Sequence, residues 1–270
     1  MNSIDKNWVA NHIDSNGEVV IPNGIEEIED EAFKDNQLVK KVVMPDSILK
    51  IGDRAFDGCT NLKEIKFSAN LITIGEDAFF ECKALKNIEL PKSVEQIGAE
   101  AFACCEELEK VLIDYESKIK ELQDYIFYEC KNLNKIQLPK SIEKIGKLAF
   151  YDCESLESFN LDIFEELLEI KEKAFQSCVA LKNIILPSSL ENIGNRAFQF
   201  CGNLEHIQFQ QNSELKKIEE RAFDGVKELK EFKLPDDVIS IGDFAFCGCE
   251  NLESIYLRRK YKNTWKLCIF

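Results

Sequence analysis

The sequence has little of what catalysis and metal binding require. Its 270 residues include two histidines, His12 and His206, which lie far apart in the chain and give no zinc-binding spacing. No glycine-rich phosphate loop and no serine or cysteine nucleophile motif is present. We therefore expect no catalytic residues, no metal site and no cofactor, and predict that the chain is not an enzyme.

Long apolar runs are also missing. Residues 1–16 contain no apolar stretch of the kind found in signal peptides, and no later stretch approaches the roughly 20 apolar residues of a membrane span. Asparagine is common, yet no Asn-x-Ser/Thr glycosylation site occurs. As written, the sequence predicts a cytoplasmic protein without a membrane span. If a signal peptide had been removed, the same sequence would fit a secreted or cell-surface protein.

The charge is strongly negative and unevenly distributed. The net charge is −15, and five basic residues without any Asp or Glu follow residue 257. An acidic body repels phosphate backbones, so nucleic acid is not an expected partner. The basic residues are interleaved with apolar ones. We therefore interpret this tail as a cap whose Lys and Arg side chains reach water, rather than as a binding site for anionic membranes.

A phenylalanine recurs along the chain at intervals of 23 or 25 residues. Such a period is typical of a solenoid, in which each coil buries its apolar side against its neighbours. We predict one elongated body of about ten coils. A monomer is favoured, although the sequence does not determine the oligomeric state. The ten residues are Phe33, Phe56, Phe79, Phe102, Phe127, Phe150, Phe175, Phe198, Phe223 and Phe246.

One coil illustrates the repeat. Residues 133–138 combine an apolar anchor with an alternating apolar pattern, which predicts a strand that Pro139 ends. Gly146 is expected to make a tight turn with positive φ. The segment from Ala149 through Phe150 to Cys153 then predicts a short helical or 3-10 turn on the convex side.

Prolines and connection lengths show that the repeat is double. From Pro91 onward prolines recur every 48 residues, and three of the proline-free strands lead into connections that are two residues longer. We infer that a short return needs proline and glycine for its sharp turn, whereas two extra residues allow ordinary side chains. The long connections are Asp114–Leu122, Asp162–Ile170 and Gln210–Ile218.

Eight of the eleven cysteines lie three residues after a repeat phenylalanine. A residue type that is fixed to the repeat phase indicates a buried apolar slot, which free cysteine fills well. Neighbours in a regular stack stand about 5 Å apart, too far for an undistorted disulfide. We predict reduced thiols. The eight are Cys59, Cys82, Cys105, Cys130, Cys153, Cys178, Cys201 and Cys249.

The ends of the repeat are predicted to be capped. We expect an N-terminal cap with a half-repeat strand at residues 1–24, repeats at residues 25–257, and a C-terminal cap at residues 258–270.

The pattern LxxIxLPxSVxxIGxxAFxxCxxL, at residues 85–108 and 133–156, resembles the BspA-like class of leucine-rich repeats, and the resemblance covers residues 18–257. It implies an α/β solenoid: a right-handed leucine-rich-repeat superhelix with a parallel sheet on its concave face and short strands and helical turns on its convex side. Members of this class are described as surface or secreted proteins that bind host or extracellular-matrix proteins, which implies a role in adhesion. Ser47, Ser93, Ser141 and Ser189 stand where other leucine-rich repeats have a buried Asn.

The outward positions of the predicted strands are the expected binding surface. A nearly uncharged stretch among them costs less to desolvate than carboxylates do, so we predict that a protein partner binds there. A plain solvated sheet face is the alternative. The predicted site residues are Lys135, Gln137, Ser158, Asn160, Asn183, Ile185, His206 and Gln208.

Two further surfaces remain open. One is the aromatic row of Phe80, Tyr128, Tyr151 and Phe200, which could instead pack between coils; the other is formed by the three long connections, with Tyr115 and Phe164. The function is accordingly either a protein-interaction module, as an adhesin or an intracellular scaffold, or a structural spacer without a specific ligand.

Overall fold

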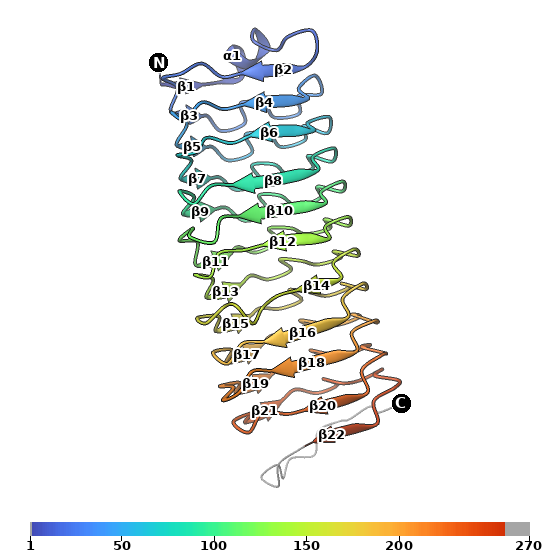
Figure 1. Cartoon of the computed structure of the whole chain (residues 1–270). Coiled ribbons are helices and arrows are strands. Elements are labelled where there is room, and N and C mark those ends of the chain that lie inside the picture. Colours follow the sequence, from blue (N-terminus) through green and yellow to red (C-terminus); the bar gives the residue numbers. More distant parts are fainter. Residues whose placement is uncertain (1, 257–270) are drawn as a thin grey trace. The chain divides into compact units, whose positions relative to one another are not determined.

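The computed structural model describes residues 2–256 of the chain. These residues fall into two compact units, unit 1 (Met1–Pro139) and unit 2 (Lys140–Phe270), which are described separately. In both units each coil contributes one strand of two to four residues and a second strand of two residues (Figure 1). The coils thereby build two rows of parallel strands, called here the long-strand row and the short-strand row.

Unit 1 contains the N-terminal half of both rows. Its long-strand row is β2 (Glu18–Val20), β4 (Lys41–Val43), β6 (Glu64–Lys66), β8 (Asn87–Leu90), β10 (Lys110–Ile113) and β12 (Lys135–Gln137). Its short-strand row is β1 (Ser3–Ile4), β3 (Glu27–Ile28), β5 (Lys50–Ile51), β7 (Thr73–Ile74), β9 (Gln96–Ile97) and β11 (Glu121–Leu122). The long strands form two sheets, β2-β4-β6 and β8-β10-β12, and the short strands β1 to β9 form a third.

Unit 2 repeats this organisation. Its long-strand row is β14 (Ser158–Phe159), β16 (Asn183–Leu186), β18 (His206–Phe209), β20 (Glu231–Lys233) and β22 (Ser254–Tyr256). Its short-strand row is β13 (Lys144–Ile145), β15 (Glu169–Ile170), β17 (Asn192–Ile193), β19 (Lys217–Ile218) and β21 (Ser240–Ile241). The long strands again form two sheets, β14-β16-β18 and β20-β22.

The phenylalanine column is the centre of the core. Rings of successive coils stack in parallel, with centroids 4.5 Å apart between Phe33 and Phe56 and 5.2 Å apart between Phe175 and Phe198. The ten rings are at most 2% exposed. Because a phenyl ring covers the spacing between two parallel strands, one ring per coil fills the space between the two rows without a gap.

The convex segments differ from the sequence-based expectation. They form turns, and α1 (Lys6–Ala10) is the single helix among residues 2–256. In each coil the residues two before and two after the repeat phenylalanine have positive φ, as Glu31 (57°) and Asp35 (57°) do around Phe33. A helix requires negative φ at every position, so this alternation excludes the predicted helical turns. The freed N–H groups bond to the next coil, as in Phe33 N–H to Ala55 O at 2.7 Å.

The glycines after the short strands serve another purpose than the one predicted. None of them has positive φ. They permit a close approach between coils: a Cβ at Gly75 would lie 2.6 Å from the Asp53 backbone nitrogen. No side chain fits at that distance, so glycine is required by the neighbouring coil and not by its own turn.

The serines that replace the usual Asn bond to the preceding coil. The Ser47 hydroxyl donates to Ile25 O at 2.7 Å, Ser93 donates to Leu71 O at 2.8 Å, and Ser189 donates to Leu167 O at 2.9 Å. Each hydroxyl therefore satisfies a carbonyl that the turn leaves without a strand partner.

At the N-terminus both rows continue to the first described residues. β1 pairs with β3 and β2 pairs with β4, with Ile4 and Val9 buried beneath them. Asp5 begins α1, and its Oδ1 accepts a hydrogen bond from the Trp8 N–H at 2.8 Å. Leu257 and the predicted C-terminal cap, residues 258–270, lie outside the described residues.

Candidate functional site

Six of the predicted site residues belong to unit 2, and five of them lie on the outward face of its long-strand row. The register aligns Ser158 with Asn183 and Asn183 with His206, and it aligns Ile185 with Gln208. All of these side chains are exposed, and Ile185 is 37% exposed. Asn160 is exposed too, but β14 ends at Phe159, so Asn160 lies just beyond its strand. Unit 2 therefore presents a contiguous neutral face over β14, β16 and β18.

The other two predicted residues, Lys135 and Gln137, belong to β12 in unit 1. Lys135 is exposed, whereas Gln137 is half-buried and donates from its Nε2 to Ile113 O at 3.3 Å. Gln137 is thus partly committed to the structure of its own unit.

The long-strand face of unit 1 has a different chemistry. Its outward side chains form ion pairs between neighbouring strands, such as Lys41 with Glu18 at 3.4 Å and Lys110 with Glu89 at 2.7 Å. A partner would have to desolvate these charges, which costs more than desolvating amides. The contrast favours the neutral face of unit 2.

The aromatic row is mainly a packing feature. Phe80, Tyr128 and Tyr151 are half-buried, and the rings of Tyr125 and Tyr128 lie 5.7 Å apart. Phe200 is the exception, because it is 50% exposed. Its ring lies over Gly225, where a Cβ would come within 2.7 Å of the ring.

The long connections contribute one exposed aromatic side chain rather than two. Tyr115 is 51% exposed, whereas Phe164 is buried in the core at 1%. Gln210 fixes the geometry of its connection, since its Nε2 donates to Asp162 O at 2.9 Å and its Oε1 accepts from Ser188 N–H at 3.0 Å. These connections are therefore rigid edges with little apolar contact surface.

The cysteine column has a role that its spacing did not predict. Seven of the eight thiols donate to the carbonyl of the preceding coil's repeat phenylalanine, as Cys59 does to Phe33 O at 3.0 Å and Cys201 does to Phe175 O at 3.1 Å. Burial raises the pKa of both thiols to about 12. Because only a thiolate is a good nucleophile or metal ligand, these cysteines are chemically inert at neutral pH.

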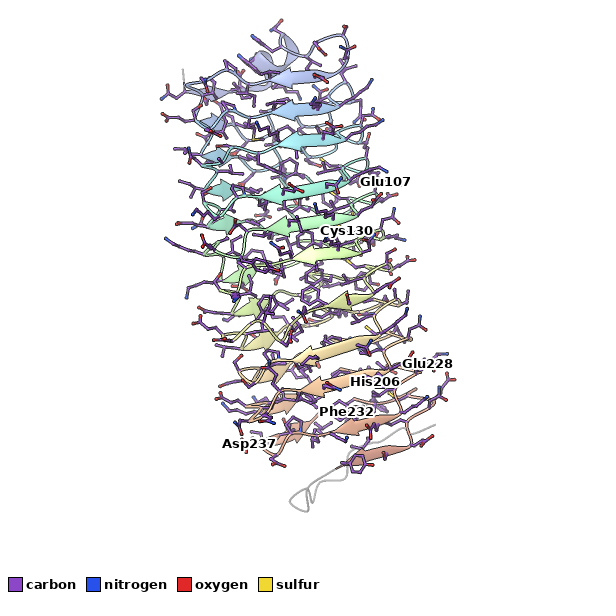
Figure 2. The ribbon with its side chains drawn as sticks, in the orientation of Figure 1. Glu107, Cys130, His206, Glu228, Phe232 and Asp237 are labelled. Atoms are coloured by element: carbon purple, nitrogen blue, oxygen red, sulfur yellow. The ribbon has the colours of Figure 1, made fainter. Side chains whose placement is uncertain are left out.

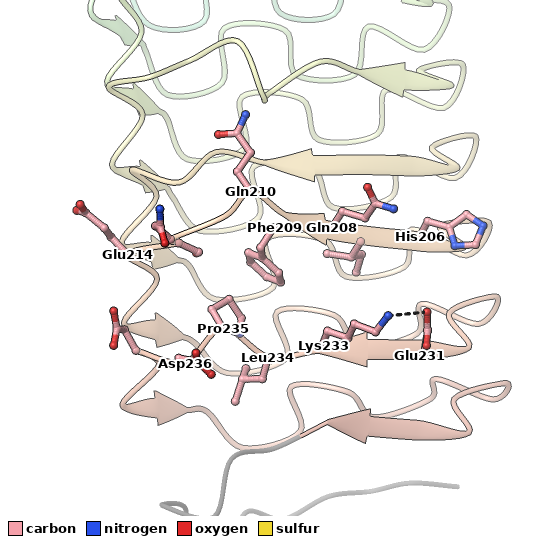
Figure 3. A pocket seen from close by; sticks show the side chains of 14 residues that line it. His206, Gln208, Phe209, Gln210, Glu214, Glu231, Lys233, Leu234, Pro235 and Asp236 are labelled. Atoms are coloured by element: carbon pink, nitrogen blue, oxygen red, sulfur yellow. Dashed lines mark ion pairs between the residues drawn. The ribbon is translucent and has the colours of Figure 1, made fainter.

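A groove that the sequence analysis did not predict lies between β18 and β20 in unit 2. Its volume is about 850 Å³, and its lining includes Phe209, Gln210, Glu214, Lys233 and Pro235 (Figure 3). It adjoins the predicted site, because His206 and Gln208 also line it. Figure 2 shows His206 on β18 and Phe232 on β20, the two strands between which the groove lies.

Residues 2–256 contain neither a cluster suited to a metal ion nor a helix suited to a membrane. No group of three or more His, Cys, Asp or Glu side chains there is arranged to hold a metal ion. No helix in that part of the chain has both the length and the apolar character needed to cross a bilayer.

The comparisons with known proteins agree with the fold. The family model described as "BspA type Leucine rich repeat region (6 copies)" matches residues 2–121, 112–217 and 208–268. The chain therefore belongs to the BspA-type leucine-rich repeat family. No curated protein matches its sequence.

The similar solved structures include several bacterial leucine-rich repeat proteins. A leucine-rich cell surface protein from Faecalibacterium prausnitzii is 26% identical, with a TM-score of 0.50, over 90% of this chain and 82% of that one. The pneumococcal vaccine antigen PcpA is also 26% identical, with a TM-score of 0.55, over 94% of this chain and 59% of that one. A leucine-rich repeat protein from Bacteroides ovatus is 27% identical, with a TM-score of 0.49, over 91% of this chain and 75% of that one.

Proposed function

We propose that the chain is a non-catalytic module that binds a protein partner on the neutral long-strand face of unit 2. The supporting observation is the contiguous uncharged surface of Ser158, Asn183, Ile185, His206 and Gln208, in a chain whose net charge is −15. Side chains held on a paired sheet lose little conformational entropy on binding, so such a face favours association.

The likeness to surface proteins bears on where this chain would meet its partner. A cell surface protein and a vaccine antigen are among the similar structures, which supports an adhesive function at a cell surface for this chain as well. An intracellular scaffold uses the same face with a different partner. A spacer without a specific ligand is the remaining alternative, and it would bind nothing.

The test is capture on immobilised protein, once with purified extracellular-matrix proteins and once with a cell lysate, followed by substitution of the neutral face. The triple variant Asn160→Glu, Ile185→Glu, Gln208→Glu should abolish binding, because each partner contact would then have to desolvate a carboxylate. Circular dichroism should show an unchanged fold, since all three side chains are exposed.

A matched control adds the same charge elsewhere in unit 2. The variant Leu168→Glu, Ile239→Glu, Ser240→Glu changes exposed residues of the short-strand side and should bind as the parent does. Binding that survives the first triple but is lost when Tyr128 and Tyr151 are replaced would move the contact to the aromatic row. Absence of any captured partner in both experiments would favour the spacer.

A further inference from the structure

The long-strand row of unit 2 is interrupted at one place. β18 pairs with β16, and β20 pairs with β22, so the two strands belong to separate sheets. The groove of about 850 Å³ opens at this interruption. Unit 1 has a corresponding interruption between β6 and β8, with a smaller groove of about 330 Å³.

A phenylalanine precedes both interruptions. The residue at the end of each long strand is aliphatic or Met in the other coils, but it is Phe67 after β6 and Phe209 at the end of β18. At β20 a second ring is added, because Phe232 stands where neighbouring strands have Ile or Val. The rings of Phe209 and Phe232 meet edge to face, 5.7 Å apart. We attribute the interruption to these rings, which are larger than the aliphatic side chains they replace and hold β20 away from β18. Within residues 2–256, the aliphatic and Met residues of the column are Ile21, Met44, Leu90, Ile113, Leu138, Leu161, Leu186 and Leu234.

The groove in unit 2 combines an apolar floor with an acidic end. Phe209, Leu234 and Pro235 are half-buried and form the floor. Figure 3 shows Glu214 and Asp236 at one end and His206 and Glu231 at the other, with Phe209 between them.

The charges in the groove do not balance. Lys233 is the single Lys or Arg of the lining, and it pairs with Glu231 at 3.5 Å. The opposite end holds Glu214 and Asp237. The nearby Lys216 interacts with both of these carboxylates and also pairs with Glu191 at 2.7 Å, so one lysine faces three acidic groups. The acidic end therefore carries negative charge in excess and is complementary to a cation.

We propose that this groove binds an arginine or lysine side chain presented by an extended segment of the partner protein. The aliphatic stem lies on Phe209 and Pro235, and the cationic group reaches Glu214 and Asp237. An aromatic floor with carboxylates at its end suits a side chain of this kind, because the stem is apolar and the head is charged. This proposal rests on the proposed function, since it names the partner chemistry at the edge of the same face.

The groove of unit 1 provides an internal comparison. Its ring, Phe67, is buried, and its lining contains Lys41, Lys63 and Lys66 against Glu64 and Glu89. That groove has neither a partly accessible aromatic floor nor excess negative charge, so it should not bind a cationic side chain.

The test uses a defined probe and the full chain. A capped, fluorescein-labelled octapeptide of alternating threonine and arginine is titrated by fluorescence anisotropy, with a second peptide in which citrulline replaces arginine. Citrulline keeps the shape and removes the charge. We expect binding of the arginine peptide that weakens as salt is raised, and at least about tenfold weaker binding of the citrulline peptide, which corresponds to about 1.4 kcal/mol.

Two variants change residues that line the groove of unit 2, and two matched variants change residues that line the groove of unit 1. Phe209→Leu places the commonest residue of this column in the groove, and Glu214→Gln with Asp237→Asn removes two charges. Each should weaken peptide binding by at least about fivefold. Phe67→Leu, and Glu64→Gln with Glu89→Gln, should leave it within about twofold. Thermal unfolding of each variant verifies that the fold is retained.

Several results would overturn the proposal. Equal loss in the matched variants would mean that the peptide binds the acidic surface in general, and equal affinity for the citrulline peptide would mean that the charge is not recognised. If the peptide bound only after Arg258, Arg259 and Lys260 were replaced by glutamine, the occupant would be the chain's own basic tail and not a partner. These outcomes are separate from the proposed function, because the probe assay does not use the Asn160, Ile185 and Gln208 variant.

Discussion

The phenylalanine column allows a quantitative test of the packing within one unit. Phe79 lies mid-stack in unit 1, with Phe56 at 4.9 Å and Phe102 at 5.2 Å on its two sides and Phe67 edge-on at 5.8 Å. Phe33 is equally buried but has a single ring neighbour, Phe56 at 4.5 Å. Replacing each by alanine removes the same side chain from two different surroundings.

The expected costs differ because the number of ring contacts differs. Truncation of a buried phenylalanine costs about 3–5 kcal/mol through lost burial and the cavity that remains. Each ring pair adds about 0.5–1.5 kcal/mol beyond burial. Phe79 loses two more ring pairs than Phe33, so Phe79→Ala should be more destabilising than Phe33→Ala by about 1–3 kcal/mol.

Urea unfolding followed by far-UV circular dichroism measures the difference, and hydrogen exchange verifies that the coils around each position open together. Exchange is needed because long repeat arrays can unfold in parts, and a single free energy then loses its meaning. If both variants cost the same within about 0.5 kcal/mol, the resolution of such comparisons, the rings do not stabilise one another as the stacking implies.

Three further predictions concern features that the fold repeats. Burial raises the pKa of the Cys201 thiol to about 12, so above a pH of about 9 this thiol keeps its proton in the folded protein and loses it in the unfolded chain. The free energy of unfolding should therefore fall as the pH rises above about 9. Cys201→Val should reduce the slope of that free energy against pH by about 1.4 kcal/mol per pH unit, as measured by urea titrations. Glu81 has positive φ (54°) whereas Glu76 does not, so Glu81→Gly should be nearly neutral and Glu76→Gly should cost about 1 kcal/mol; equal melting shifts would contradict this. Gly75→Ala should destabilise by at least about 1 kcal/mol through collision with the preceding coil, and Gly202→Ala, with open space around it, should not; thermal unfolding compares them.

The sequence predicts the parts of the fold that the repeat phase controls. Spacing alone identified the ring at Phe150, the strand at residues 135–137 and the slot of Cys153. These positions face the same surroundings in every coil, so packing selects the same kind of residue each time. The spacing itself predicted one parallel strand in each coil, and the second row of short strands was expected only from the family resemblance.

Backbone conformation was harder to predict, because different side chains adopt the same unusual geometry. Positive φ recurs at Asp35, Phe200 and Tyr125, three residues with nothing in common in their side chains. Glycine is the residue from which positive φ is normally inferred, yet the glycines after the short strands do not have it. Here the coil-to-coil hydrogen bonds determine the conformation, and they become visible only once the coils are stacked.

The sequence also predicts only those parts of the candidate site that depend on a single coil. Exposed positions such as Asn183 and Ile185 follow from strand alternation, because outward side chains are those that the core does not select. The groove depends instead on contacts between coils. A phenylalanine at position 209 was the available indication, since it departs from the aliphatic column, but its consequence depends on Phe232 in the next coil.

The two interruptions of the long-strand row show how a repeat protein can gain a specific surface without losing its core. The phenylalanine column passes both interruptions intact, with Phe56 and Phe79 stacked at 4.9 Å in unit 1 and Phe198 and Phe223 stacked at 5.4 Å in unit 2. Because stability resides in that column and in the short-strand row, which pairs without interruption from β17 through β19 to β21, a pair of long strands can separate at small cost. A groove can then form between the two separated strands, and the residues that line it do not have to fit the packing of a paired strand. We infer that a solenoid of this kind can acquire a new binding groove by substitutions at the ends of its long strands, as at Phe209, without insertions in the connections.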